Sequence, residues 1–202
     1  ADYKKKIDFK NHTGGESPVE QHQRNCLMEG IKNALPDDYI VLSDSDEIPD
    51  FTKIEDINLT KKYLAFSQKM FMYKLNLQNL NESNWIGSKI TKKKYIKSMQ
   101  DLRNLKFKKY PFWRIDKYNQ EIINGGWHFS FLQSPHQILT KIKSFSHGEF
   151  NKEGINKKNI EEKILRNEDI FERKNKLKKV TIDNSYPDYI INNKDKLSNW
   201  II

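Results

Sequence analysis

The stretch from Tyr39 to Asp50, YIVLSDSDEIPD, constrains the fold more than any other part of the chain. Its first half is a short apolar run, and its second half places acidic side chains at the end of that run, before Pro49. A short apolar run that stops at a turn is typical of a buried strand. In α/β sheets, ligands bind beyond the carboxyl ends of the strands. The stretch therefore predicts a buried strand over 39–43 with a ligand site at its end.

The acidic residues at this end, Asp44, Asp46 and Glu47, allow two interpretations. Carboxylates this close repel one another unless a cation or solvent compensates their charge. Two aspartates separated by one residue can offer oxygens to one Mg²⁺ or Mn²⁺ ion, which keeps positions free for substrate phosphates. The same pattern also forms Asx turns and helix caps. From these residues alone, both interpretations stay open.

Composition limits the class of protein and its partners. The chain has 202 residues and a formal net charge of +9, from 36 Lys and Arg against 27 Asp and Glu. This excess favours anionic partners, such as nucleic acid, an anionic lipid or sugar, or a phosphorylated substrate, although a solvated lysine-rich surface has the same composition. Cys26 is the only cysteine, which excludes an internal disulfide and a CxxC zinc site.

Targeting signals are not evident in the sequence as given. No apolar run approaches the roughly 18 residues that span a bilayer, and the first ten residues, ADYKKKIDFK, lack the apolar segment of a signal peptide. We therefore expect no transmembrane segment and a cytoplasmic location, or a peripheral one at a membrane surface through the basic charge.

Two Ser-Pro sequences indicate where helices begin. Ser17-Pro18-Val19-Glu20 and Ser134-Pro135-His136-Gln137 both combine an N-cap serine, proline at the first helical position and Glu or Gln at the capping-box position. The first predicts a helix with one buried face that ends before Pro36, and the second a helix that buries Ile138, Ile142 and Phe145. The other predicted elements are strands over 63–69 and 70–76, a strand-like segment over 85–99, a charged helix over 158–174 and a last helix after Pro187.

Strands that alternate with helices indicate an α/β fold. No internal repeat and no linker rich in Pro, Gly or Ser divides the chain. We expect one domain over 1–202, with a core over 17–150 and a helical extension over 151–202. The sheet is expected to be mixed and mostly parallel, with helices on its faces.

Two later stretches combine side chains suited to chemistry. Residues 125–130, GGWHFS, join a flexible turn to an indole and an imidazole, which suits a sugar ring beside hydrogen-bonding groups. Alternatively, Trp127 is simply a residue of the hydrophobic core, and His128 is a structural histidine. In residues 141–149, KIKSFSHGE, His147 and Glu149 would point the same way in an extended chain. One of the two could ligate a metal while the other takes a proton.

Four motifs in order resemble those of one enzyme family. They are Glu20-x-x-x-Arg24-Asn25, the segment LSDSDEIP over 42–49, the segment GGWHFS over 125–130, and Lys141 with the segment KSFSHGE over 143–149. The tail around Tyr186-Pro187-Asp188-Tyr189 also fits. In this order and spacing, the chain resembles glycosyltransferase family 17, the β-1,4-N-acetylglucosaminyltransferases that place the bisecting residue on N-glycans. The resemblance covers about residues 17–149.

The resemblance implies a GT-A fold and an inverting transfer of a sugar, N-acetylglucosamine from UDP-GlcNAc, to a hydroxyl of a glycan acceptor. It implies Mn²⁺ or Mg²⁺ held against the donor diphosphate by Asp44 and Asp46, with His147 completing the metal shell or touching phosphate. Trp127 and His128 would lie at the sugar. The residues implied in binding the donor are Glu20, Arg24, Asn25, Gly125, Gly126, Trp127 and Lys141.

An inverting transfer needs a base that deprotonates the acceptor hydroxyl. Glu149 is our first candidate, followed by Glu47 and His128. GT-A folds usually begin with a nucleotide-binding strand and helix, and the residues before Ser17 are too few to supply that whole unit. We therefore expect a shortened N-terminus or a nucleotide pocket that is built differently.

Two other functions share some of these features. A metal-dependent phosphoryl-transfer enzyme, such as a nuclease, could use the same acidic turn with His128 or His147. A non-catalytic basic module could bind nucleic acid through lysines and aromatic rings. The lysines are scattered, however, and no recognised nucleic-acid module is present. We expect a glycosyltransferase with no nucleic-acid partner.

Overall fold

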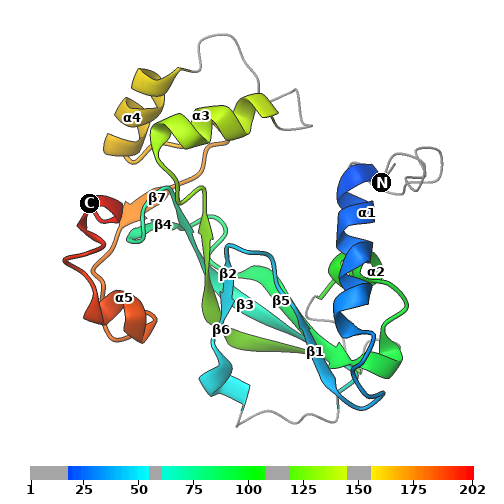
Figure 1. The fold of residues 1–202 in the computed structure, drawn as a ribbon. Helices are drawn as coiled ribbons and strands as arrows, with labels where there is room; N and C mark the ends of the chain where they lie inside the picture. The colour runs from blue at the N-terminus through cyan, green and yellow to red at the C-terminus, as the bar shows by residue number, and fades with distance from the viewer. Residues whose placement is uncertain (1–17, 55–60, 108–118, 145–155) are drawn as a thin grey trace. The chain divides into compact units, whose positions relative to one another are not determined.

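The chain forms a mixed α/β structure around one hydrogen-bonded set of strands (Figure 1). The computed structural model describes residues 18–54, 61–107, 119–144 and 156–202. The strands are β1 (Tyr39–Leu42), β2 (Glu47–Pro49), β3 (Tyr63–Met72), β4 (Leu77–Asn79), β5 (Trp85–Lys92), β6 (Gln120–Ser130) and β7 (Leu177–Lys179). They follow the order β1-β5-β3-β4-β7, with β6 beside β3 and β2 beside β6.

The expectation of a mostly parallel sheet is wrong. Every strand pair with a described register, namely β1–β5, β2–β6, β3–β4 and β4–β7, is antiparallel. The connections explain this result. Only residues 73–76 separate β3 from β4, whereas a parallel pair needs a crossover of about a dozen residues or more.

The chain divides into two compact units. The first unit comprises 1–44, 51–66 and 86–124, and the second comprises 45–50, 67–85 and 125–202. Three strands, β3, β5 and β6, each begin in one unit and end in the other. The boundary between Asp44 and Ser45 lies within the acidic turn, so the two aspartates of that turn belong to different units.

The first unit holds α1 (Pro18–Cys26) and α2 (Met99–Asn104), together with the 3₁₀ helices η2 (Leu27–Ile31), η3 (Phe51–Ile54) and η4 (Lys93–Tyr95). One apolar cluster joins Leu64, Phe66, Ile90 and Ile123. A second joins Leu42 of β1 to Met99 and Leu102 of α2, with Met28 and Ile31 of η2 packed against it.

The helix predicted after Ser17 is shorter and less buried than expected. Ser17 lies outside the described residues, and α1 ends at Cys26, where the chain tightens into η2. No residue of α1 is buried, and Cys26 is exposed. Because a 3₁₀ helix has three residues per turn, the apolar stripe loses its phase, and Leu27 remains 49% exposed.

The predicted strand over 39–43 is present as β1, but it is not buried throughout. Tyr39 and Val41 are 40% and 41% exposed, and Leu42 is buried. β1 stands at the end of the strand order and, among the described strands, pairs only with β5. Alternate side chains of a strand point to opposite faces, so Ile40 and Leu42 pack against α2 while Tyr39 and Val41 face solvent.

The second unit carries the helices α3 (Pro135–Ser144), α4 (Lys157–Leu165) and α5 (Asp188–Asn192), and the 3₁₀ helix η7 (Ser198–Trp200). Ile138 and Ile142 of α3 pack with Ile160 and Ile164 of α4 and with strand residues such as Met72 and Leu77. Another cluster gathers Phe71, Phe129, Ile182, Tyr186 and Ile190.

The capping box predicted at the start of α3 is confirmed. The backbone N–H of Gln137 donates to Ser134 Oγ at 3.3 Å, and the backbone N–H of Ser134 donates to Gln137 Oε1 at 3.0 Å. Ile138 and Ile142 are buried as expected, while Phe145 lies outside the described residues. Local hydrogen-bonding chemistry therefore determines where this helix begins.

Three other expectations need correction. The strands predicted over 63–69 and 70–76 are one strand, β3, which runs from Tyr63 to Met72 because no turn residue interrupts it there. The segment over 85–99 is a strand only to Lys92. The charged helix ends at Leu165, because the chain turns at Asn167 with a positive φ of 58°.

Within the described ranges, no helix is long and apolar enough to cross a bilayer.

Candidate active site

In the first unit, residues of the short helix α2 bind several of the predicted site residues. Arg24 donates through Nη1 to Gln100 Oε1 at 2.7 Å, and Asn25 Oδ1 accepts from the backbone N–H of Gln100 at 3.1 Å. Arg103, one turn later, forms an ion pair with Asp44, with Nη2 2.9 Å from Oδ2. Glu20 lies half-buried on the first turn of α1.

The helix that carries Arg103 is itself held by hydrogen bonds from Lys89 and Ser98. Lys89 is only 3% exposed, and its ammonium donates to the carbonyl of Arg103 and, at 2.9 Å, to that of Leu105. These carbonyls end α2, where backbone acceptors lack partners within the helix. Ser98 caps the other end by accepting from the backbone N–H of Asp101 at 3.0 Å. The Asp44 carboxylate therefore faces a guanidinium whose helix is anchored at both ends.

In the second unit, the register of β2 against β6 brings the acidic turn to the histidine. Glu47 pairs with His128 and Ile48 with Trp127. The backbone N–H of Phe129 donates to the carbonyl of Asp46 at 2.8 Å. Since directly paired residues of an antiparallel ladder share a face, Glu47 and His128 lie side by side.

The imidazole of His128 is buried between Asp46 and Trp85. Its Nε2 lies 3.3 Å from Asp46 Oδ2, and its ring lies 4.8 Å from the indole of Trp85. Nδ1 is buried and has no hydrogen-bond partner among the residues that the structure describes. The indole N–H of Trp85 donates to Glu47 Oε1 at 2.9 Å, and Glu47 is only 6% exposed. Trp85 therefore contacts both polar residues of the pair.

Asp46 is held in its charged form. Burial alone would raise its pKa, but the hydrogen bond and charge of His128, with a smaller contribution from Lys141 on α3, keep the pKa of the Asp46 carboxyl below its usual value. Its side chain is 37% exposed. A carboxylate that is ionised and open to solvent can accept a cation or a ligand hydroxyl.

The two glycines and Trp127 lie on β6 itself. Gly126 has φ +113°, and a Cβ placed there would lie 2.5 Å from the carbonyl oxygen of Ile48. The close approach of β2 to β6 therefore requires glycine at this position. Trp127 is partly buried, and its indole N–H donates to the carbonyl of Ser185 at 3.0 Å. Gly125, which precedes Gly126, is half-buried in the same strand.

The structure thus places the predicted residues in two groups. Arg24, Asn25 and Asp44 meet around α2 in the first unit, and Asp46, Glu47 and His128 meet beside Trp85 in the second. His147 and Glu149 lie outside the described residues. Within the part that is described, no group of three or more His, Cys, Asp or Glu side chains is arranged to hold a metal ion.

Sequence reasoning missed three residues of these groups, Trp85, Gln100 and Arg103. One signal was available for two of them: Ser98-Met99-Gln100-Asp101 is a capping pattern, which predicts a helix that would carry Gln100 and Arg103. No comparable signal marks Trp85. Its role depends on the contact of β5 with a distant turn.

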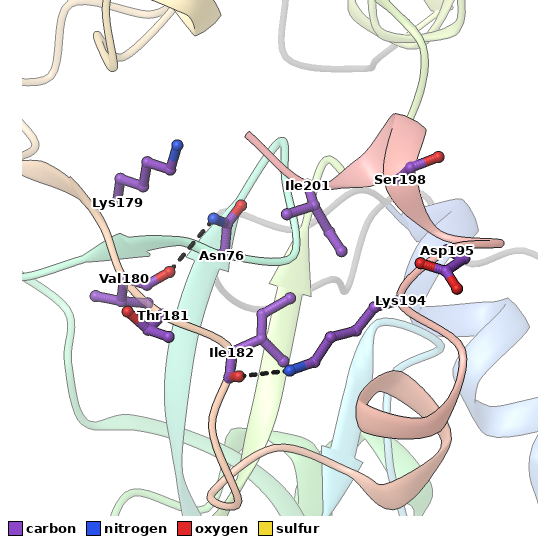
Figure 2. Close-up of a pocket in the computed structure, with 9 residues that line it drawn as sticks. All are labelled: Asn76, Lys179, Val180, Thr181, Ile182, Lys194, Asp195, Ser198 and Ile201. Carbon is purple, nitrogen blue, oxygen red and sulfur yellow. Dashed lines mark hydrogen bonds between the residues drawn. The ribbon is translucent and has the colours of Figure 1, made fainter.

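A separate hollow of about 700 Å³ lies in the second unit (Figure 2). Asn76 and Lys194 border it, and their side chains donate to the carbonyls of Val180 at 3.3 Å and Ile182 at 2.9 Å. None of the predicted site residues that the structure describes lines this hollow. We therefore place the candidate chemistry at the two groups above.

Comparison with known families identifies the family of this chain. The sequence model of glycosyltransferase family 17 matches residues 4–175. The chain belongs to this family and is therefore a glycosyltransferase. No curated protein and no solved structure matches the chain. The match extends over the acidic turn, α2, His128 and α3, so both groups of site residues lie within it.

Proposed function

We propose that the protein is a metal-dependent, inverting glycosyltransferase that moves N-acetylglucosamine from UDP-GlcNAc to a hydroxyl of a glycan acceptor. Membership of family 17 supports sugar transfer from a nucleotide-sugar donor and decides against the nuclease-like and nucleic-acid-binding alternatives. The observation that carries the proposal is the Asp46 carboxylate, which is ionised, partly exposed and fixed against His128. The GT-A assignment rests on the family resemblance and stays a prediction.

The proposed cation-binding residues are Asp44 and Asp46, joined by His147. Both aspartates carry side chains that are 37% exposed. Mg²⁺ and Mn²⁺ commonly take one or two protein carboxylates and fill the remaining positions with water and substrate phosphates. Two exposed carboxylates in one turn fit that requirement. When bound, the cation would neutralise the charge that develops on the departing diphosphate.

The surrounding residues are proposed to bind and orient the donor. Arg24, held by Gln100, would contribute positive charge toward the nucleotide with Asn25 and Glu20. Arg103 would hold Asp44 until the cation replaces it. Gly125, Gly126 and Trp127 would form the wall against the sugar, and the charge of Lys141, which already acts on Asp46, would face a phosphate.

The base remains Glu149 in this proposal. A general base must come within hydrogen-bond reach of the acceptor hydroxyl. Glu47 and His128 are each 6% exposed, with Glu47 bound to Trp85 and His128 bound to Asp46. Burial and these bonds support positioning roles for both. His128 would keep Asp46 fixed and charged beside the donor, and Glu47 would fix the Trp85 ring that packs against His128.

One experiment tests the proposal directly. With UDP-GlcNAc and Mn²⁺, the protein should release UDP slowly, and the pair should raise the melting temperature because they bind the folded state. Asp46→Ala should abolish Mn²⁺-dependent release while the far-ultraviolet spectrum stays unchanged. Asp195→Ala, which removes an exposed aspartate at the separate hollow, is the control. Unchanged turnover in Asp46→Ala would refute the metal assignment.

A second variant tests the base. Glu149→Gln should retain the thermal stabilisation by UDP-GlcNAc and Mn²⁺ but lose sugar transfer. Loss of the stabilisation as well would show that Glu149 binds the cation or the donor, and the base would then lie elsewhere. A panel of nucleotide sugars in the same assay identifies the donor.

A further inference from the structure

The ion pair between Arg103 and Asp44 ties a guanidinium to one of the proposed cation ligands. Nη2 of Arg103 lies 2.9 Å from Oδ2 of Asp44, and both residues belong to the first unit. The two side chains are 20% and 37% exposed, so a ligand from solvent can reach them. Ion pairs that solvent reaches usually contribute little to stability. Stability alone therefore does not account for this contact.

The helix α2 holds Arg103 in a fixed position beside a second guanidinium. Lys89 is only 3% exposed, and its ammonium donates to the backbone carbonyl of Arg103. Gln100, three residues earlier on the helix, accepts from Nη1 of Arg24 at 2.7 Å. Residues three apart lie on one side of a helix, so α2 carries Arg103 and the residue that holds Arg24 on the same side. Groups that are fixed before a ligand arrives lose little freedom when they bind it.

Arg103 and the proposed cation require the same carboxylate. Mg²⁺ and Mn²⁺ bind carboxylate oxygens, and Oδ2 of Asp44 is the oxygen that Arg103 contacts. A divalent ion on Asp44 would also place a like charge beside the guanidinium, which is unfavourable unless an anion compensates both charges. The cation alone must therefore compete with Arg103 for Asp44.

The donor diphosphate would supply the compensating anion. In the proposed function the diphosphate meets the cation at Asp44, so its oxygens come close to the guanidinium that contacts the same carboxylate. A guanidinium presents a rigid fork of N–H donors that matches carboxylate and phosphate oxygens alike. Its bonds to phosphate are charge-assisted and are stronger than bonds between neutral groups. Arg103 can therefore exchange the Asp44 carboxylate for a phosphate and keep an anionic partner.

We propose that Arg103 is a diphosphate-binding residue, which Asp44 holds in place until cation and nucleotide arrive. Asp44 then turns to the cation, and Arg103 donates to a phosphate oxygen of the nucleoside diphosphate. The inference rests on the proposed function, because it takes Asp44 as a cation ligand and a nucleotide sugar as the donor. The cation alone displaces Arg103 without compensation, whereas cation and diphosphate together satisfy both side chains. The two ligands therefore strengthen each other's binding.

The test measures the binding of metal and of nucleotide separately. Free Mn²⁺ is counted by electron paramagnetic resonance, and the binding of UDP and of inorganic pyrophosphate, each with Mn²⁺ present, is measured by calorimetry. Arg103→Met should bind Mn²⁺ alone more tightly than the original protein, because Asp44 has lost a competing partner. The same variant should bind UDP and pyrophosphate at least about tenfold more weakly, since a charge-assisted bond to phosphate is lost. A merely structural Arg103 would not move the two affinities in opposite directions.

Two further variants complete the test. Arg166→Met, which removes an exposed arginine at the end of α4 in the second unit, should leave both affinities unchanged. Arg103→Lys keeps the charge but loses the fork, so it should retain only part of the UDP affinity, and it carries the test if thermal unfolding shows that Arg103→Met is misfolded.

The outcomes separate this role of Arg103 from the proposed function. An original protein that binds neither Mn²⁺ nor UDP would overturn both. If it binds both ligands, the role of Arg103 alone is overturned by Mn²⁺ affinity in Arg103→Met that is not raised, by unchanged UDP affinity, or by a loss seen with UDP but not with pyrophosphate.

Discussion

The indole N–H of Trp85 donates to Oε1 of Glu47 across 2.9 Å, and the same ring rests 4.8 Å from the imidazole of His128. Trp85 opens β5, whereas Glu47 opens β2 and His128 lies near the end of β6. Three segments distant in sequence thus meet at one indole. The positions of Glu47 and His128 beside Asp46 therefore depend on Trp85, a residue that carries no charge.

Trp85→Phe should weaken this arrangement while keeping most of the ring contact. The buried Glu47 carboxylate loses a donor, which costs about 1–3 kcal/mol of unfolding free energy. In donor turnover, kcat should fall while KM for UDP-GlcNAc stays near its original value, because Trp85 contacts the positioning residues rather than the donor. Trp200→Phe, in η7, is the matched control. A loss of stability with unchanged kcat would show that Trp85 is purely structural.

Gly126→Ala should destabilise the fold strongly. The new Cβ would lie 2.5 Å from the carbonyl oxygen of Ile48, and φ is +113°. Backbone strain of this kind costs about 1–3 kcal/mol, and separation of β2 from β6 adds to that cost. Gly30→Ala is the control, since nothing lies within 4 Å of its Cβ position. Urea unfolding of both variants measures the difference, and similar midpoints would contradict the prediction.

The hydrogen bond between Asp46 and His128 should make stability depend on pH. The folded-state pKa of Asp46 is lowered, so the folded state favours the carboxylate relative to the unfolded chain, whose aspartate pKa is about 3.9. Its contribution is therefore present above about pH 4 and is lost as pH falls through the folded-state pKa. Asp46→Asn should remove part of the acid dependence of the melting temperature. Parallel curves for the two proteins between pH 3 and pH 6 would exclude this contribution.

Replacement of Asp169, a buried acidic residue of the second unit, should lower the unfolding free energy strongly. Its side chain is only 3% exposed, and it accepts from Tyr73 Oη, Arg173 Nε and Asn175 Nδ2, each at 2.8 Å. Burial would raise its pKa, but these donors outweigh burial and keep it below the usual value. Asp169→Ala leaves buried donors without an acceptor and should cost about 3 kcal/mol of unfolding free energy. Asp188→Ala, at an exposed site in α5, should cost far less.

The start of α3 could be predicted from sequence because its determinants are local. Ser134 and Gln137 lie three residues apart and bond each other's backbone. The direction of the strands could not be predicted, since pairing between distant segments sets it, and the exposure of Tyr39 and Val41 follows from the edge position of β1 rather than from the residues themselves.

The candidate site was predictable as a set of residues but not as an arrangement. Asp46 and His128 were both recognised by type, yet only the register of β2 against β6 brings them together. Arg24 was assigned to the nucleotide, but its contact with Gln100 required knowledge of α2. Trp85 begins the segment predicted as strand-like over 85–99, which is a strand only to Lys92, and its bond to Glu47 depends on tertiary contact alone.

The exposed Cys26 gives this protein a built-in attachment point for a reporter. It is the only thiol of the chain, it ends α1 two residues after Arg24, and its Sγ lies 3.6 Å from His22 Nε2. A maleimide dye or a nitroxide would react at this one position without any engineered cysteine. Its fluorescence or line shape would then test in real time whether a nucleotide arrives at the neighbouring guanidinium of Arg24, as proposed above.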